Sequence, residues 1–291
     1  MTTISFIGLG VMGLPMAINL QRAGFTVTCT SRSEESRSRG RAHGLAVVDG
    51  IDDLDRTDAV VTMLPDSPDV EAVLLDERGL FATAAPHTLF IDMSTTSPAT
   101  AHRASERAAE ASLGFVDAPV SGGEAGAIEG SLSVMAGGSD SDIAAAGPIL
   151  EAVGSTIVHV GANGAGQVVK AANQLVVAGN LQMLAEAIVF LEAHGIELEK
   201  ALDVLGGGLA GSTALDRKRE SFLERRYTPG FRLELHAKDL RIGAEAASAA
   251  GVALPASAVV SQLVQASVAR GDGGLDHSAL LKLAEELSGR R

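Results

Sequence analysis

Short apolar runs alternate with helix-like segments along the first half of the chain. The runs are rich in β-branched residues and are bounded by Gly, Asp or Ser, which is typical of buried strands. They lie at residues 4–8, 25–30, 59–64, 88–92, 114–117, 132–136 and 157–160. A helical pattern fills residues 11–23 and most of the other intervals. Strands that alternate with helices predict an α/β fold with a doubly wound parallel sheet.

The strand pattern stops after Gly161, at the glycine-rich segment GANGAG. A long apolar helix is predicted from about residue 165 to residue 194, and the remainder reads as helices broken at 206–211, 228–230 and 251–255. We therefore expect an α/β domain at residues 1–162, an interdomain helix at 163–194 and an all-α C-terminal domain at 195–291.

Composition and charge narrow the classes of function. The chain has 291 residues, 46% of them hydrophobic and only 3% aromatic, so aliphatic side chains must build the core. A net charge of −13 argues against a nucleic-acid partner, because phosphate backbones require a basic surface. Cys29 is the single cysteine, which excludes an intramolecular disulfide and a cysteine-rich metal site. We expect no metal and a reducing, cytoplasmic location.

Two apolar segments have to be distinguished from targeting or membrane segments. The N-terminal run has no positive residue before it, unlike a signal peptide. Residues 175–191 are interrupted by Asn180, Gln182 and Glu186, whereas a membrane span needs about 20 mostly apolar residues. We interpret this stretch as a buried helix and expect no membrane partner.

The segment GLGVMG, residues 8–13, follows the first predicted strand and opens a helix. In this context Gly8 allows a tight turn, Gly10 lets the backbone approach a pyrophosphate, and Gly13 lets the helix pack on the strand. Val11 and Met12 complete the loop, and the helix N-terminus offers N–H groups to phosphates. The motif predicts a dinucleotide site; a purely structural turn is the alternative.

The end of the second predicted strand bears on the choice of dinucleotide. An acid there would accept from a ribose hydroxyl and favour NAD, but Ser31, Arg32 and Ser33 occupy the place. Arg32 can pair with a 2′-phosphate, so we expect NADP, with NAD as the alternative. A solvated arginine beside Glu34 and Glu35 would carry no specificity.

Two further loops follow predicted strands at the edge where ligands of such sheets bind. Leu64 and Pro65 are expected to pack on the cofactor, while Ser94 and Thr95 are expected to donate hydrogen bonds to it. Ordinary turn chemistry would explain the same residues.

Ser121, Gly122 and Gly123 follow the fifth predicted strand. A hydroxyl beside two glycine N–H groups suits a carboxylate of the substrate. A flexible surface loop is equally compatible with this composition.

Lys170 lies in the apolar helix of a chain that has only five lysines. A lysine carries a movable proton, which an arginine does not, so an acid–base role is one reading. Reaching out to water or pairing with another subunit are the others. Asn173 and Gln174 follow at positions that neighbour Lys170 on a helix, and either amide can orient a substrate oxygen.

Six segments taken together resemble the β-hydroxyacid dehydrogenase family. They are FIGLGVMGLPMAINL, MLPDSPDV, FIDMSTTSP, DAPVSGGEAGAIEGSLSVMAGG, GAGQVVKAANQ and GFRLELHAKDL, in the order of the family. The resemblance implies a Rossmann-type domain, a long interdomain helix, a helical C-terminal domain and a homodimer or homotetramer. It also implies roles for four residues: Lys170 as the catalytic lysine, Lys238 as a contact of the cofactor, Asp239 as its support and Phe231 as a neighbour of the substrate.

Within the family, KAANQ and residues 206–216, 228–240 and 276–280 look most like tartronate semialdehyde reductases. These enzymes reduce 2-hydroxy-3-oxopropanoate to D-glycerate, and Ser212 and Thr213 would add hydroxyl partners for such a substrate. A 3-hydroxyisobutyrate dehydrogenase and a broader reductase of succinic semialdehyde or glyoxylate are the alternatives. A non-catalytic NADP-binding scaffold or sensor is the alternative from another class.

Overall fold

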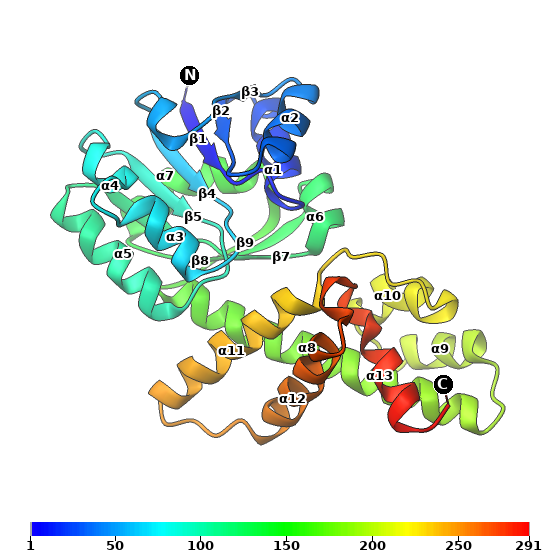
Figure 1. Ribbon diagram of the computed structural model, residues 1–291. Helices are drawn as coiled ribbons and strands as arrows, with labels where there is room; N and C mark the ends of the chain where they lie inside the picture. Colours follow the sequence, from blue (N-terminus) through cyan, green and yellow to red (C-terminus); the bar gives the residue numbers. More distant parts are fainter. Residues whose placement is uncertain (1, 291) are drawn as a thin grey trace. The chain divides into compact units, whose positions relative to one another are not determined.

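The computed structural model describes residues 2–290 and divides into two compact units (Figure 1). The first unit ends at Lys170 and the second begins at Ala171, so the division falls inside the long helix α8 (Ala165–Ala193). The first unit contains two hydrophobic cores, and a separate core lies in the second unit.

The first unit is built on one nine-stranded sheet. Its strands are β1 (Thr3–Ile7), β2 (Thr26–Thr30), β3 (Ala46–Val47), β4 (Ala59–Thr62), β5 (Leu89–Asp92), β6 (Gly114–Asp117), β7 (Val120–Ser121), β8 (Leu132–Gly137) and β9 (Gly154–Gly161). The order is β3-β2-β1-β4-β5-β6-β8-β7, with β9 paired to β8. The pairs from β3 through β6 are parallel, as is β8 with β9. The α/β fold class predicted from the sequence is confirmed.

Helices pack against this sheet through two hydrophobic cores. The helices are α1 (Gly13–Arg22), α2 (Glu34–Ala42), α3 (Ser67–Leu74), α4 (Leu80–Thr83), α5 (Pro98–Glu110), α6 (Gly123–Glu129) and α7 (Asp140–Glu151). Neighbouring residues of one strand enter different cores: Val61 joins the core with α1, and Val60 joins the core with α5. Strands buried on both faces explain why the sequence shows continuous apolar runs.

The sheet departs from the prediction at one end. Strand β8 runs antiparallel to β6 and β7, whereas an entirely parallel sheet was expected. The reason is the short connection: only the seven-residue helix α6 lies between β7 and β8, and a parallel crossover needs about a dozen residues. Strands β3 and β7 have two residues each, too few to show a pattern in sequence.

The second unit is helical. After α8 come α9 (Leu198–Gly206), α10 (Thr213–Glu224), α11 (Leu233–Ala249), α12 (Pro255–Ala269) and α13 (Leu280–Leu287). The predicted breaks fall between these helices. Helix α8 is long and apolar enough to cross a membrane, although core helices of soluble proteins pass the same test and 44% of its apolar window is buried. Its second-unit part exposes Val176, Met183 and Phe190, spaced seven residues apart.

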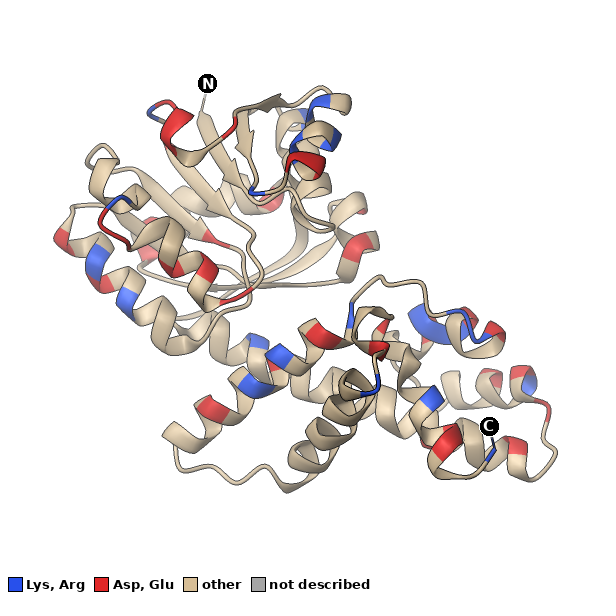
Figure 2. Ribbon diagram, in the orientation of Figure 1, with Lys and Arg blue, Asp and Glu red and all other residues tan. Residues whose placement is uncertain are grey.

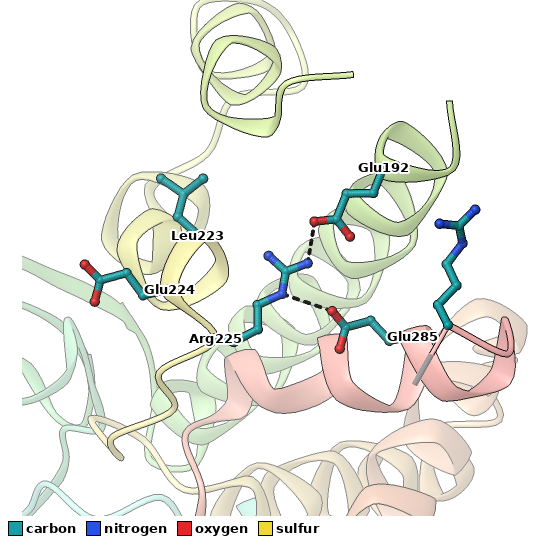
Figure 3. A pocket seen from close by; sticks show the side chains of 6 residues that line it. Glu192, Leu223, Glu224, Arg225 and Glu285 are labelled. Atoms are coloured by element: carbon teal, nitrogen blue, oxygen red, sulfur yellow. Dashed lines mark hydrogen bonds and ion pairs between the residues drawn. The ribbon is translucent and has the colours of Figure 1, made fainter. Parts of the chain in front are cut away.

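An arginine network ties three helices of the second unit together (Figure 3). Arg225 follows α10 and donates to Glu192 of α8 at 2.6 Å and to Glu285 of α13 at 3.0 Å. It also donates to the carbonyl of Phe222 at 2.6 Å. Arg225, Glu192 and Glu285 line a hollow of about 480 Å³, and none of the site residues predicted from the sequence lines it.

Arg225→Met should lower the free energy of unfolding by about 2–3 kcal/mol, because the buried carboxylate of Glu285 and the partly exposed carboxylate of Glu192 lose their shared partner. Urea denaturation measures it. Arg226→Met is the matched control: the Arg226 side chain is 61% exposed, and its pairs with Glu220 and Glu224 should contribute about 0–1 kcal/mol. Equal losses in the two variants would contradict a structural role for Arg225.

Candidate functional site

The loop between β1 and α1 has the geometry that a phosphate-binding loop requires. Gly8 has φ +108°, and a Cβ there would lie 2.2 Å from the carbonyl oxygen of Met63. A Cβ at Gly13 would lie 1.8 Å from the carbonyl oxygen of Gly8, whereas at Gly10 it would meet open space. Helix α1 has no side-chain cap at its N-terminus. Open space over uncapped N–H groups fits a pyrophosphate.

The residues after β2 form an exposed turn. The Arg32 side chain is 88% exposed, and its guanidinium lies 3.2 Å from Asp69 Oδ1. Ser33 caps α2 by accepting from the Ser36 N–H, so part of its hydroxyl is used within the turn. Arg37 donates to the carbonyls of Ser31 at 2.7 Å and Arg32 at 3.1 Å. Figure 2 shows both acidic and basic residues on α2: Glu34 and Glu35 lie in its first turn, next to these residues, and Arg39 and Arg41 lie in its last turn.

The loops after β4 and β5 are joined to each other. The Leu64 N–H donates to Ser94 Oγ at 2.8 Å, and the Ser94 N–H donates to Asp92 Oδ1 at 3.1 Å. Ser94 is fully buried, Leu64 and Thr95 are half-buried, and Pro65 is exposed. The structure therefore brings two of the predicted cofactor loops together, but Ser94 uses its hydroxyl to connect them.

The first turn of α8 is held against the carboxyl edge of the sheet by Asp117. One carboxylate oxygen of Asp117 accepts from the Gly164 N–H at 2.7 Å, and the other accepts from the Gln167 N–H at 3.2 Å. A Cβ on Gly166 would lie 2.4 Å from the Met135 carbonyl oxygen, so only glycine permits this close approach. Burial raises the pKa of Asp117 to about 7, aided by the charge of Asp92 and opposed by these hydrogen bonds.

Lys170 lies one turn further along α8 and is only 5% exposed. Its Nζ donates to the carbonyl oxygen of Val120 at 2.7 Å. Val120 directly precedes Ser121, so the predicted acid–base lysine and the predicted carboxylate loop lie side by side in the first unit. Gly122 and Gly123 have φ values of +143° and +64°, conformations that side chains rarely adopt.

In the second unit, four predicted residues form a chain of polar contacts. The Asn173 side-chain amide donates to Gln174 Oε1 at 2.8 Å, and Gln174 Nε2 donates to Asp239 Oδ2 at 2.5 Å. The ammonium of Lys238 lies 2.9 Å from Asp239 Oδ1. Gln174 thus uses both ends of its amide, and Asp239, 2% exposed, supports both Gln174 and Lys238.

A buried histidine pair also belongs to this unit and was not predicted from the sequence. His236 Nε2 lies 3.2 Å from the Gln174 carbonyl oxygen, and His236 Nδ1 lies 3.2 Å from His277 Nδ1. Because a carbonyl only accepts, the proton of His236 sits on Nε2, and His277 donates between the rings. Phe231 packs edge-on against both rings. The sequence signal was a histidine in each of the segments LELHAKDL and DHSAL.

Asp276 holds the Phe231 segment in place. One of its oxygens accepts from the N–H groups of Gly230 and Phe231 and from Lys218. Burial works to raise the pKa of Asp276, but the charges of His277 and Lys218 and hydrogen bonds from Lys218 and Ser278 hold it at about 2. Ser212, which was predicted to meet the substrate, caps α10 by accepting from the Leu215 N–H. Among residues 2–290, no three His, Cys, Asp or Glu side chains gather as metal ligands would.

Asp117→Asn should change how stability depends on pH. A buried acid with a pKa of about 7, above its unfolded value, favours folding at low pH and loses this contribution as pH rises from about 4 to 7. The slope is at most about 1.4 kcal/mol per pH unit. Urea unfolding from pH 4.5 to 8 should show a smaller decline in Asp117→Asn than in the wild type. Parallel stability curves for the two proteins would contradict this.

Comparisons with known proteins agree with this geometry. A family model for the NAD binding domain of 6-phosphogluconate dehydrogenase matches residues 3–161. A second, for the NAD-binding region of NADP-dependent 3-hydroxyisobutyrate dehydrogenase, matches residues 164–284.

Two curated relatives and one solved structure match along the whole chain. The chain is 36% identical to 2-hydroxy-3-oxopropionate reductase of Escherichia coli, covering 99% of each protein. It is 35% identical to NAD-dependent L-serine dehydrogenase of Pseudomonas aeruginosa, covering 100% of each. The structure of Mycobacterium tuberculosis 3-hydroxyisobutyrate dehydrogenase with L-serine has a TM-score of 0.87 at 34% identity, covering 97% of this chain and 99% of that one. These matches confirm that the chain belongs to the β-hydroxyacid dehydrogenase family and is an NAD(P)-binding oxidoreductase.

Proposed function

We propose that this enzyme reduces a small carboxylate-bearing aldehyde with NADPH, and that tartronate semialdehyde, reduced to D-glycerate, is its substrate. The observation that carries the proposal is the buried Lys170, hydrogen-bonded to the carbonyl that precedes the Ser121–Gly123 loop. The similarity to 2-hydroxy-3-oxopropionate reductase supports this choice of aldehyde. A 3-hydroxyisobutyrate dehydrogenase and a reductase of succinic semialdehyde or glyoxylate are the competing assignments.

The residues of the first unit fit the cofactor. The Gly8–Gly13 loop, with Val11 and Met12, and the N-terminus of α1 would hold the pyrophosphate. Arg32 and the serines beside it would meet a 2′-phosphate. When bound, the cofactor supplies a hydride to the aldehyde carbon. In the second unit, Lys238, held by Asp239, would contact the cofactor.

Lys170 would donate the proton that the reduced aldehyde oxygen needs. The substrate carboxylate would accept hydrogen bonds from the Ser121 hydroxyl and the N–H groups of Gly122 and Gly123. The ammonium of Lys170 stabilises the negative charge that grows on the aldehyde oxygen and then protonates it. In the oxidative direction, neutral Lys170 would take the proton back. The Val120 carbonyl fixes one N–H of the ammonium and so orients the others.

The two amides after Lys170 are assigned different roles. Gln174 is 5% exposed and its amide is engaged by Asn173 and Asp239. We infer that Asn173, which is half-buried and uses one N–H in this chain, presents its oxygen to the substrate hydroxyl. Gln174 would orient Asn173.

We further propose a cytoplasmic homodimer or homotetramer. The exposed stripe of Val176, Met183 and Phe190 on α8 supports self-association, because apolar side chains repeated every seven residues suit packing against another helix.

Lys170→Met should keep the fold and NADPH binding but lower kcat for tartronate semialdehyde by about 10² to 10⁴, the usual size of general acid–base help. Steady-state kinetics measures it, with methylmalonate semialdehyde and succinic semialdehyde as competing substrates. Near-normal turnover of the variant would remove Lys170 from this role. A wild-type preference for another aldehyde would reassign the substrate.

Arg32→Ala should lower kcat/KM for NADPH by about 10- to 100-fold, as expected when a charge-assisted hydrogen bond is lost, and leave kcat/KM for NADH almost unchanged. Asp69→Asn is the matched control, since it removes the acid that pairs with Arg32 and should strengthen NADPH binding. A wild-type preference for NADH, or equal losses with both cofactors in Arg32→Ala, would contradict the assignment.

A further inference from the structure

Gln167 is a buried amide whose two ends both bind one loop. It is the third residue of α8 and is 1% exposed. Its Oε1 accepts from the Thr96 N–H at 3.0 Å, and its Nε2 donates to the Ser94 carbonyl at 2.9 Å. Thr96 and Ser94 follow β5, more than 70 residues earlier in the chain. The amide therefore attaches the first turn of α8 to the loop after β5.

That loop does not stand alone. Ser94 accepts from the Leu64 N–H through its hydroxyl, and its own N–H is bonded to Asp92, which also accepts from the Thr62 hydroxyl. Hydrogen bonds thus join the loops after β4 and β5, and the sequence predicts that both loops contact the cofactor. The side chain of Gln167 connects α8 to these two joined loops.

Lys170 lies three residues after Gln167, on the same side of the helix. The side-chain amide of Gln167 and one turn of α8 therefore connect the loop after β5 to Lys170. Asp117 holds the same turn through the Gln167 N–H, which leaves the backbone little freedom to shift.

The contacts of Gln167 require an amide. A glutamine is a donor and an acceptor at once, as the Ser94 carbonyl and the Thr96 N–H demand. Methionine matches its length but offers no strong donor or acceptor. An ionised glutamate would satisfy Thr96 but would place a second oxygen against the Ser94 carbonyl.

We propose that Gln167 is a positioning residue, which locks the Ser94–Thr96 loop to the first turn of α8 and so sets the position of Lys170 relative to the bound cofactor. The proposal rests on the function proposed for Lys170. It goes beyond that function because it assigns a residue that would touch neither the substrate nor the reacting atoms.

The first test compares Gln167→Met with Asn163→Ala. Asn163 also anchors the start of α8, but its amide donates to the Phe115 carbonyl at 2.8 Å and the Gly137 carbonyl at 3.3 Å, not to the cofactor loops. Gln167→Met should lower kcat by about 10- to 100-fold, as displacement of a catalytic group does, and should weaken NADPH binding measured by fluorescence. Asn163→Ala should lose thermal stability while keeping most of its kcat and its NADPH affinity.

The second test uses pH. A protonated glutamate at position 167 donates and accepts as the glutamine does, so kcat of Gln167→Glu, divided by that of the wild type at the same pH, should rise as pH falls. Asp117 and Asp92 at the strand ends, His102 of α5 and Lys170 of α8 are the titratable groups around this turn. Titration of these groups that affects both proteins equally cancels in the ratio of the two kcat values.

Three results would overturn the role of Gln167. They are unchanged kcat in Gln167→Met, losses in Gln167→Met no larger than in Asn163→Ala at matched stability, and a Gln167→Glu ratio that does not vary with pH. If the wild type turns over no aldehyde, the proposed function fails instead. In that case NADPH binding still tests the role of Gln167. An unchanged dissociation constant for NADPH in Gln167→Met would overturn the positioning role.

Discussion

The carboxylate of Asp117, closing on the N–H groups of Gly164 and Gln167, is the interaction on which the candidate site depends. The first N–H groups of a helix have no partners within the helix, and here the buried carboxylate of Asp117 accepts hydrogen bonds from two of these N–H groups. Since Gly166 lets the same turn approach the sheet, α8 begins at the carboxyl edge. Lys170 can then reach the carbonyl of Val120.

Buried carboxylates also bind polar groups in the second unit, near the predicted site residues. Asp239 uses one oxygen for Gln174 and the other for Lys238. Asp276 accepts from the Phe231 N–H with one oxygen and from the Ser278 N–H with the other. Burying a carboxylate is costly unless its oxygens are satisfied, so each of these acids fixes the groups around it. In this chain, which has few aromatic residues, hydrogen bonds thus hold these side chains in place.

The sequence predicted what local patterns determine. The strands, the long helix and the breaks between the C-terminal helices follow from periodicity and glycine placement, and the roles of Gly8 and Gly13 follow from their position between strand and helix. It did not predict the contacts that join distant segments, such as Arg225 with Glu285 or Gln167 with Ser94. Nothing local distinguishes these residues from surface polar ones. The roles that we propose for Asn173 and Gln174 likewise depend on Asp239, which lies 65 residues further along the chain than Gln174.

We propose that Lys170 gives a proton to the substrate and does not act through its charge alone. Lys170→Arg separates the two, because arginine keeps the positive charge but holds its proton at neutral pH. Single-turnover measurement of NADPH oxidation with tartronate semialdehyde, at saturating cofactor, tests the claim most directly. If Lys170 gives the proton, this variant should still bind NADPH but react more slowly by a factor of about 10² or more. A rate within a few-fold of the wild type would show that charge alone suffices and would contradict the account.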